Sequence, residues 1–196
     1  MDLVEQYNRD KVGFISKDLF QWLHLVDKDN LKDGSEKSRI LRELLREVSI
    51  EELEKFSGDC IDEKGPDAGM VLQDLVSEVG RRIGFEIEYG KYRKCPYDGI
   101  WKTSDSGGRT IVLEVKKNTT YQIDIKKLES ARKDIVNDRY HMLTDYQPSI
   151  RFMYAADRDS PEIRAERKRR ILQADQYRGE NFGDIFPLLN KVLRIY

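Results

Sequence analysis

The segment Ile111-Val112-Leu113-Glu114-Val115-Lys116-Lys117 decides the fold of this chain. Its β-branched and apolar residues predict a buried, central β-strand. Glu114 and Lys116 are two positions apart, so both side chains are expected to leave the sheet on the same face. Burying an unpaired charge costs free energy. We therefore expect these two charged side chains to be paired or to take part in the chemistry of a site. The plain alternative is a surface ion pair on an edge strand, which the apolar character of the segment disfavours.

A second strand and a tight turn precede this segment. Residues 97–101 are expected to form the strand, and Asp105-Ser106-Gly107-Gly108 is typical of a hairpin turn because these residue types tolerate positive φ. Facing residues in a hairpin have numbers with a constant sum, here about 212 or 213, which Asp98 and Glu114 fit. Two carboxylates would then face each other about 5 Å apart at the backbone, and this repulsion favours a divalent cation between them. Asp98 could otherwise be a turn residue before Gly99.

The flanking segments predict an α/β domain. A helix is expected after Pro66, with apolar residues at helical spacing up to Ile83 and an end at Gly84. Strands are expected at residues 85–89 and 150–155, and further helices at 124–137 and 161–176. The order helix, three strands, helix, strand, helix predicts a mixed sheet flanked by helices.

Residues 1–64 have the pattern of short helices joined by polar loops, whereas residues 65–196 also contain predicted strands. We therefore predict a small helical region at 1–64 followed by the α/β core at 65–196. Ser16 is expected to cap one N-terminal helix, and Ser49 with Glu52 fits a capping box for another. This region could bind DNA, a fused or partner subunit, or a second copy of the chain as a homodimer. Its sequence leaves these alternatives open.

Composition excludes several classes of protein. Lys and Arg total 35 against 36 Asp and Glu in 196 residues, which rules out a uniformly basic nucleic-acid coat but permits a local basic patch. The two cysteines do not form a disulfide framework, no apolar run is long enough for a membrane helix, and the N-terminus lacks signal-peptide features. A cytoplasmic protein without a membrane partner is expected. With only His24 and His141, catalysis by a Ser-His or Cys-His pair has little support.

The paired carboxylates and the lysine fit metal-assisted hydrolysis. Magnesium prefers carboxylate oxygens, and Mn²⁺ is an expected substitute. A bound metal can polarise a phosphoryl oxygen and lower the pKa of water. A neighbouring lysine can orient that water or stabilise charge in the transition state.

Asp98 and the tripeptide Glu114-Val115-Lys116, preceded by an acidic helix, resemble the motif of the PD-(D/E)XK nuclease superfamily. The proline of the signature is displaced, because Pro96 precedes Tyr97 rather than Asp98. The resemblance covers residues 67 to about 190 and implies a restriction-endonuclease-like core. It further implies that Asp98, Glu114 and the Val115 carbonyl bind metal and that Lys116 positions or activates the attacking water.

In this superfamily the first core helix often supplies another acidic or amide group to the site. Glu78 and Gln73 compete for that role here. Glu78 is preferred for its ligand chemistry and Gln73 is the second choice, although the sequence around Gln73 matches the corresponding place in restriction-type relatives. Asp74 is expected to be exposed.

Two further segments resemble elements of restriction-endonuclease domains, namely residues 117–124 and Gln176-Tyr177-Arg178-Gly179. They imply that the substrate is DNA and that the role is restriction or another defence system. A DNA repair or junction-resolving nuclease is an alternative, as is a nuclease fold kept only for binding. Lys117, Lys126 and Lys127 are candidate contacts to the DNA backbone, whereas the basic residues at 164–170 alternate with acids and favour ion pairs along a helix.

Overall fold

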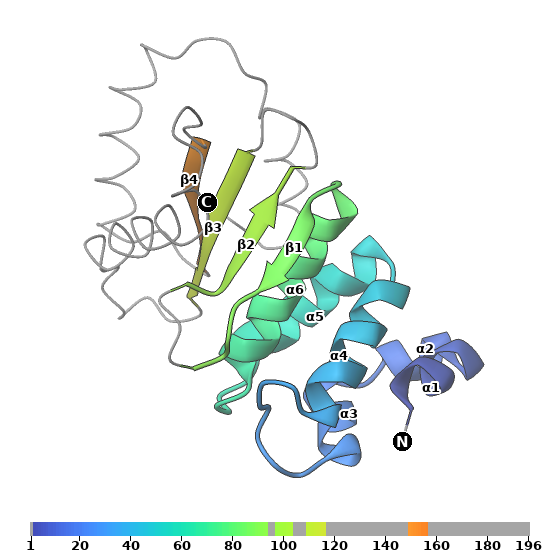
Figure 1. Ribbon diagram of the computed structural model, residues 1–196. Coiled ribbons are helices and arrows are strands. Elements are labelled where there is room, and N and C mark those ends of the chain that lie inside the picture. Colours follow the sequence, from blue (N-terminus) through green and yellow to red (C-terminus); the bar gives the residue numbers. More distant parts are fainter. Residues whose placement is uncertain (1, 94–96, 104–108, 117–148, 157–196) are drawn as a thin grey trace.

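The computed structural model describes residues 2–93, 97–103, 109–116 and 149–156, and for residues 109, 110, 114, 116 and 149–156 it describes the backbone alone. In this part of the chain six helices precede four strands (Figure 1). No described helix is long and apolar enough to cross a membrane. In chain order the elements are α1 (Leu3–Arg9), α2 (Lys11–Ile15), α3 (Leu19–Val26), α4 (Glu36–Glu47), α5 (Ile50–Asp62), α6 (Ala68–Arg82), β1 (Glu86–Tyr89), β2 (Gly99–Lys102), β3 (Arg109–Lys116) and β4 (Ser149–Ala156).

Polar side chains fix where the N-terminal helices begin. The capping box predicted for α5 is confirmed: the Ser49 hydroxyl accepts from the amide of Glu52 at 3.2 Å, and the Glu52 carboxylate accepts from the amide of Ser49 at 2.5 Å. The predicted cap of α3 was wrong. Asp18 caps this helix by accepting from the amide of Phe20 at 2.6 Å, whereas Ser16 lies at the end of α2. The Ser16 hydroxyl instead donates to the carbonyl of Gly13 at 2.8 Å, within the turn that ends α2.

The four strands form one mixed sheet in the order β1-β2-β3-β4. The first three are antiparallel neighbours, and β4 runs parallel to β3. The predicted α/β arrangement and the pairing of β2 with β3 are therefore confirmed. The predicted hairpin turn at residues 105–108 and the predicted helices at 124–137 and 161–176 lie outside the described residues.

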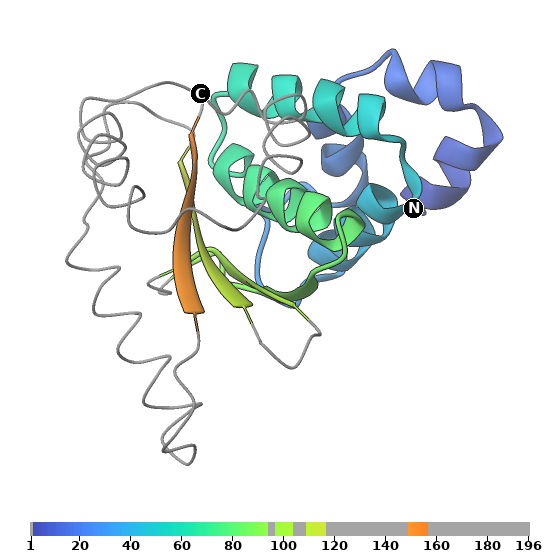
Figure 2. The same ribbon diagram turned by 90° about the horizontal axis from the view of Figure 1, so that it is seen from above.

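Helix α6 lies between the N-terminal helices and the sheet (Figure 2). Every residue from Met70 to Gly80 is buried. At Gly80 the helix meets the sheet so closely that an added Cβ would lie 2.3 Å from Cε2 of Trp101. The predicted end of the helix is confirmed, because Gly84 follows it with a φ of +95°, a conformation that favours glycine.

One core of buried apolar side chains runs through the described part of the chain. It joins Leu44 and Phe56 of the N-terminal region to Val76 of α6 and to Trp101 and Leu113 of the sheet. Apolar packing is thus continuous across the predicted boundary between residues 64 and 65.

Candidate active site

Asp98 lies directly before β2 and is bound to β3 by two hydrogen bonds. Its backbone amide donates to the carbonyl of Leu113 at 2.9 Å. Its carboxylate oxygen Oδ2 accepts from the backbone amide of Val115 at 2.6 Å. The two β3 partners stand on either side of Glu114, so Asp98 is fixed beside the backbone of that residue.

The strand register agrees with this placement. Gly99 pairs with Leu113 and Lys102 with Thr110, which is the register predicted from the hairpin spacing, and a further step in this register would bring Asp98 opposite Glu114. On its other side the backbone of Glu114 pairs with Tyr154 of β4, and that of Lys116 with Ala156. The side chains of Glu114 and Lys116 lie outside the described residues, and their convergence on Asp98 stays a prediction.

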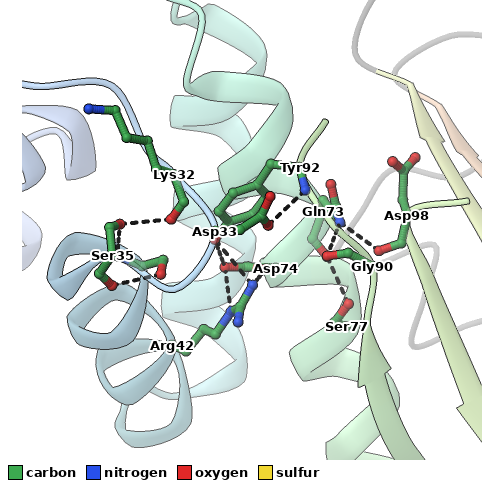
Figure 3. A network of polar contacts seen from close by, with 11 residues as sticks. Lys32, Asp33, Ser35, Arg42, Gln73, Asp74, Ser77, Gly90, Tyr92 and Asp98 are labelled. Carbon is green, nitrogen blue, oxygen red and sulfur yellow. Dashed lines mark hydrogen bonds and ion pairs between the residues drawn. The ribbon is translucent and has the colours of Figure 1, made fainter. Parts of the chain in front are cut away.

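Gln73 connects α6 to the backbone that carries Asp98. Its side-chain amide donates to the carbonyl of Asp98 at 2.6 Å and to the carbonyl of Gly90 at 3.1 Å (Figure 3). Gln73 is only 3% exposed, so these two bonds satisfy carbonyl groups that have little access to water. Of the two helix positions weighed from the sequence, the second choice is the one that contacts Asp98.

Gly90 permits the close approach that this arrangement needs. Its amide donates to the carbonyl of Asp98 at 3.1 Å. An added Cβ at this position would lie 2.5 Å from the carbonyl carbon and oxygen of Asp98. Gly90, Gln73 and Asp98 therefore form a compact backbone junction at the ends of β1 and β2.

Glu78 has a different set of partners. Its carboxylate is 1% exposed and accepts hydrogen bonds from Arg81 at 2.7 and 2.8 Å and from Arg82 at 2.8 Å. Arg82 also donates to the carbonyls of Leu45 and Val48 at 2.7 and 2.5 Å. Both oxygens of Glu78 thus bind arginines, and one of these, Arg82, connects α6 to the end of α4. In the described contacts Gln73, and not Glu78, lies beside Asp98.

Asp74 was expected to be exposed, and this expectation was wrong. Its side chain is completely buried and binds the Arg42 guanidinium through both oxygens, at 2.9 and 3.1 Å. The hydroxyl of Tyr92 donates to it at 2.5 Å. Burial raises the pKa of Asp74, against the opposing effects of Arg42 and Tyr92. Helix α6 is packed on several sides, so it has no solvent face at this position.

The donor groups in the described region fit a hard cation only in part. Asp98 supplies a carboxylate at a fixed place, as a magnesium ligand would. Within the described residues, no three or more His, Cys, Asp or Glu side chains gather into a metal-binding group. Because the side chain of Glu114 is not among those described, the expected pair of carboxylates lies outside this search.

Comparison of the chain with protein-family models, with curated proteins and with solved structures gave no match.

Proposed function

We propose that this chain is a metal-dependent endonuclease that hydrolyses DNA phosphodiester bonds. The observation that carries the proposal is the attachment of Asp98 to β3 on both sides of Glu114, through the carbonyl of Leu113 and the amide of Val115. Two carboxylates held on neighbouring strands at this spacing repel each other unless a cation lies between them. Such a pair can supply two carboxylate ligands to one divalent cation.

Each residue of the proposed site has a distinct role. Asp98, Glu114 and the carbonyl of Val115 would hold Mg²⁺, for which Mn²⁺ can substitute. A cation bound there would polarise the scissile phosphate and lower the pKa of water. Lys116 orients the attacking water and stabilises the charge that develops on phosphate oxygens. Gln73 fixes the backbone of Asp98, a positioning role that its two hydrogen bonds support.

A restriction or other defence role is proposed for this nuclease. It is supported by the resemblance of residues 117–124 and 176–179 to restriction-endonuclease domains. A repair or junction-resolving nuclease would share the same chemistry and would differ in the shape of DNA that it cleaves.

The test is cleavage of linear duplex, branched and single-stranded DNA, with Mg²⁺ and with excess chelator. We expect metal-dependent cleavage by the wild-type protein and none by Asp98→Asn. This variant is a close control because the amide oxygen of asparagine can still accept from Val115, so the fold is retained while a charged ligand is lost. Cleavage of branched DNA alone would identify a junction-resolving enzyme. No cleavage of any DNA, or of RNA, by the folded wild-type protein would refute the nuclease proposal and favour a binding module.

A further inference from the structure

The connection between β1 and β2 is attached at several points to the rest of the protein. Its first residue, Gly90, donates to the carbonyl of Asp98 at 3.1 Å and accepts from Gln73 at 3.1 Å. Two residues later the backbone amide of Tyr92 donates to the carboxylate of Asp33 at 2.9 Å. Residues 90–93, here called the connection segment, are therefore held against both α6 and the N-terminal region.

The side chain of Tyr92 is the main anchor of the connection segment. Its hydroxyl donates to Asp74 at 2.5 Å and accepts from Arg42 at 3.3 Å, and the Arg42 guanidinium lies 5.4 Å from the centre of its ring (Figure 3). Burial and the neighbouring Asp74 raise the pKa of Tyr92 well above its ordinary value, so the hydroxyl keeps the proton that it donates. The anchor fixes the backbone immediately before and after it.

Two exposed cations, Lys91 and Arg93, flank this anchor. Within the described part of the chain neither side chain takes part in a hydrogen bond or ion pair. The cationic side chains that the structure describes on α6 and β2, and Arg42 of α4, are already paired. Arg42 binds Asp74, Lys102 binds Glu88 at 3.0 Å, and Arg81 and Arg82 both bind Glu78.

We propose that Lys91 and Arg93 contact the phosphate backbone of DNA beside Asp98. The inference rests on the proposed nuclease function and adds a surface that grips its substrate. A pair of carboxylates repels phosphate, so a polyanionic substrate needs local positive charge in a protein whose net charge is −1. Cations on an anchored segment lose less conformational freedom on binding than cations on a free loop. Two phosphate contacts would strengthen binding to any DNA sequence, because the phosphates carry no base information.

The test measures DNA binding separately from cleavage. Binding of a labelled duplex is followed by fluorescence anisotropy in the presence of chelator over a series of salt concentrations. The variant Lys91→Gln/Arg93→Gln is compared with Arg9→Gln/Lys11→Gln, which removes the same two kinds of charge at the same spacing. Arg9 and Lys11 are exposed, and their helices α1 and α2 lie beyond α4 from the sheet (Figures 1 and 2).

The logarithm of the DNA association constant falls linearly with the logarithm of the salt concentration. We expect Lys91→Gln/Arg93→Gln to make this slope less steep by about 1.8, which corresponds to the loss of two phosphate contacts. At 0.1 M salt its affinity should fall on the order of tenfold to a hundredfold, with unchanged urea unfolding. The control should bind like the wild type. An unchanged slope, an equal loss in both double variants, or a wild type that does not bind DNA would overturn the inference.

Cleavage by the wild type separates this inference from the proposed function. If the wild type cleaves DNA and the Lys91→Gln/Arg93→Gln variant binds DNA normally, the proposed phosphate contact is wrong and the proposed nuclease function is retained. If this variant loses DNA affinity and the control variant does not, but the wild type cleaves no DNA, the phosphate contact is supported and the nuclease function is refuted.

Discussion

Asp98 differs from an ordinary turn aspartate because both its backbone and its side chain bind the neighbouring strand. Its carboxylate accepts from the amide of Val115, and its carbonyl accepts from Gln73 and Gly90. Together with the bond from its amide to Leu113, these bonds fix three atoms of the residue: the amide nitrogen, the carbonyl oxygen and Oδ2. A carboxylate held in this way needs little rearrangement before it can bind a ligand, which is the property that a metal site requires.

Lys116 is the residue whose replacement tests the chemistry most directly. Lys116→Ala is expected to lower DNA cleavage by about 10²–10³-fold or more, because a positive charge beside the developing phosphate charge is lost. The thermal midpoint should stay within about 2 °C of the wild type if the residue has no structural role. Cleavage assays and thermal unfolding measure the two effects, with the exposed Lys28→Ala as a control. Wild-type cleavage by Lys116→Ala would refute its proposed role.

Gln73 offers a test between positioning and metal binding. Gln73→Glu would place a buried carboxylate against the carbonyls of Gly90 and Asp98, where the amide now donates two hydrogen bonds. We expect a loss of about 3 kcal/mol or more in the free energy of unfolding, measured with urea. The same substitution at the exposed Gln21 of α3, Gln21→Glu, should change the free energy of unfolding by less than about 0.5 kcal/mol. A metal ligand at position 73 would instead tolerate glutamate and bind the cation more tightly.

Helix α6 is the element on which the arrangement depends, since it contacts α4 and α5 as well as all three antiparallel strands. Its burial explains why charged residues on it are paired: Asp74 binds Arg42, and Glu78 binds Arg81 and Arg82. A charge without a partner in such a position would be costly. The helix therefore holds the junction at Asp98 in place from one side and is itself held by the N-terminal helices from the other.

Two glycines of α6 should respond in opposite directions to the same substitution. Gly80→Ala would bring a methyl group to within 2.3–2.6 Å of the Trp101 ring, and we expect a loss of about 1–3 kcal/mol in stability. Gly69→Ala meets nothing within 4 Å and should gain roughly 0.4–1 kcal/mol, because alanine restricts the unfolded chain. Urea unfolding of both variants measures the difference. Equal effects would show that α6 does not approach β2 as closely as described.

At the scale of the whole molecule, the N-terminal region and the sheet share one hydrophobic core. A fragment of residues 65–196 would expose the face of α6 that packs on α4 and α5, including the buried Asp74, which binds Arg42 of α4. We expect this fragment to lack a cooperative unfolding transition, measured by circular dichroism during urea titration. A cooperative transition like that of the whole chain would show that the predicted division at residue 65 separates two independent domains.

Local spacing was enough to predict much of the α/β fold. The register of β2 on β3 followed from the position of the turn residues. Residues that pair across a hairpin are equally far along the chain from its turn, so the position of the turn sets which residues pair. The capping box of α5 and the end of α6 before Gly84 followed from short sequence patterns for the same reason. In each of these cases the deciding contacts lie within the element or its immediate neighbour.

By itself, the sequence determined the strand that carries Glu114 and Lys116 and the register of that strand on β2. Only the tertiary structure decided which face of α6 meets that strand, and so placed Gln73 against Asp98, turned Glu78 to the arginines and buried Asp74 beneath Tyr92. Helical periodicity could not resolve this choice, because a helix packed on several sides has no polar face. Its orientation is then set by partners distant in the sequence, such as Arg42, whose position no local pattern encodes.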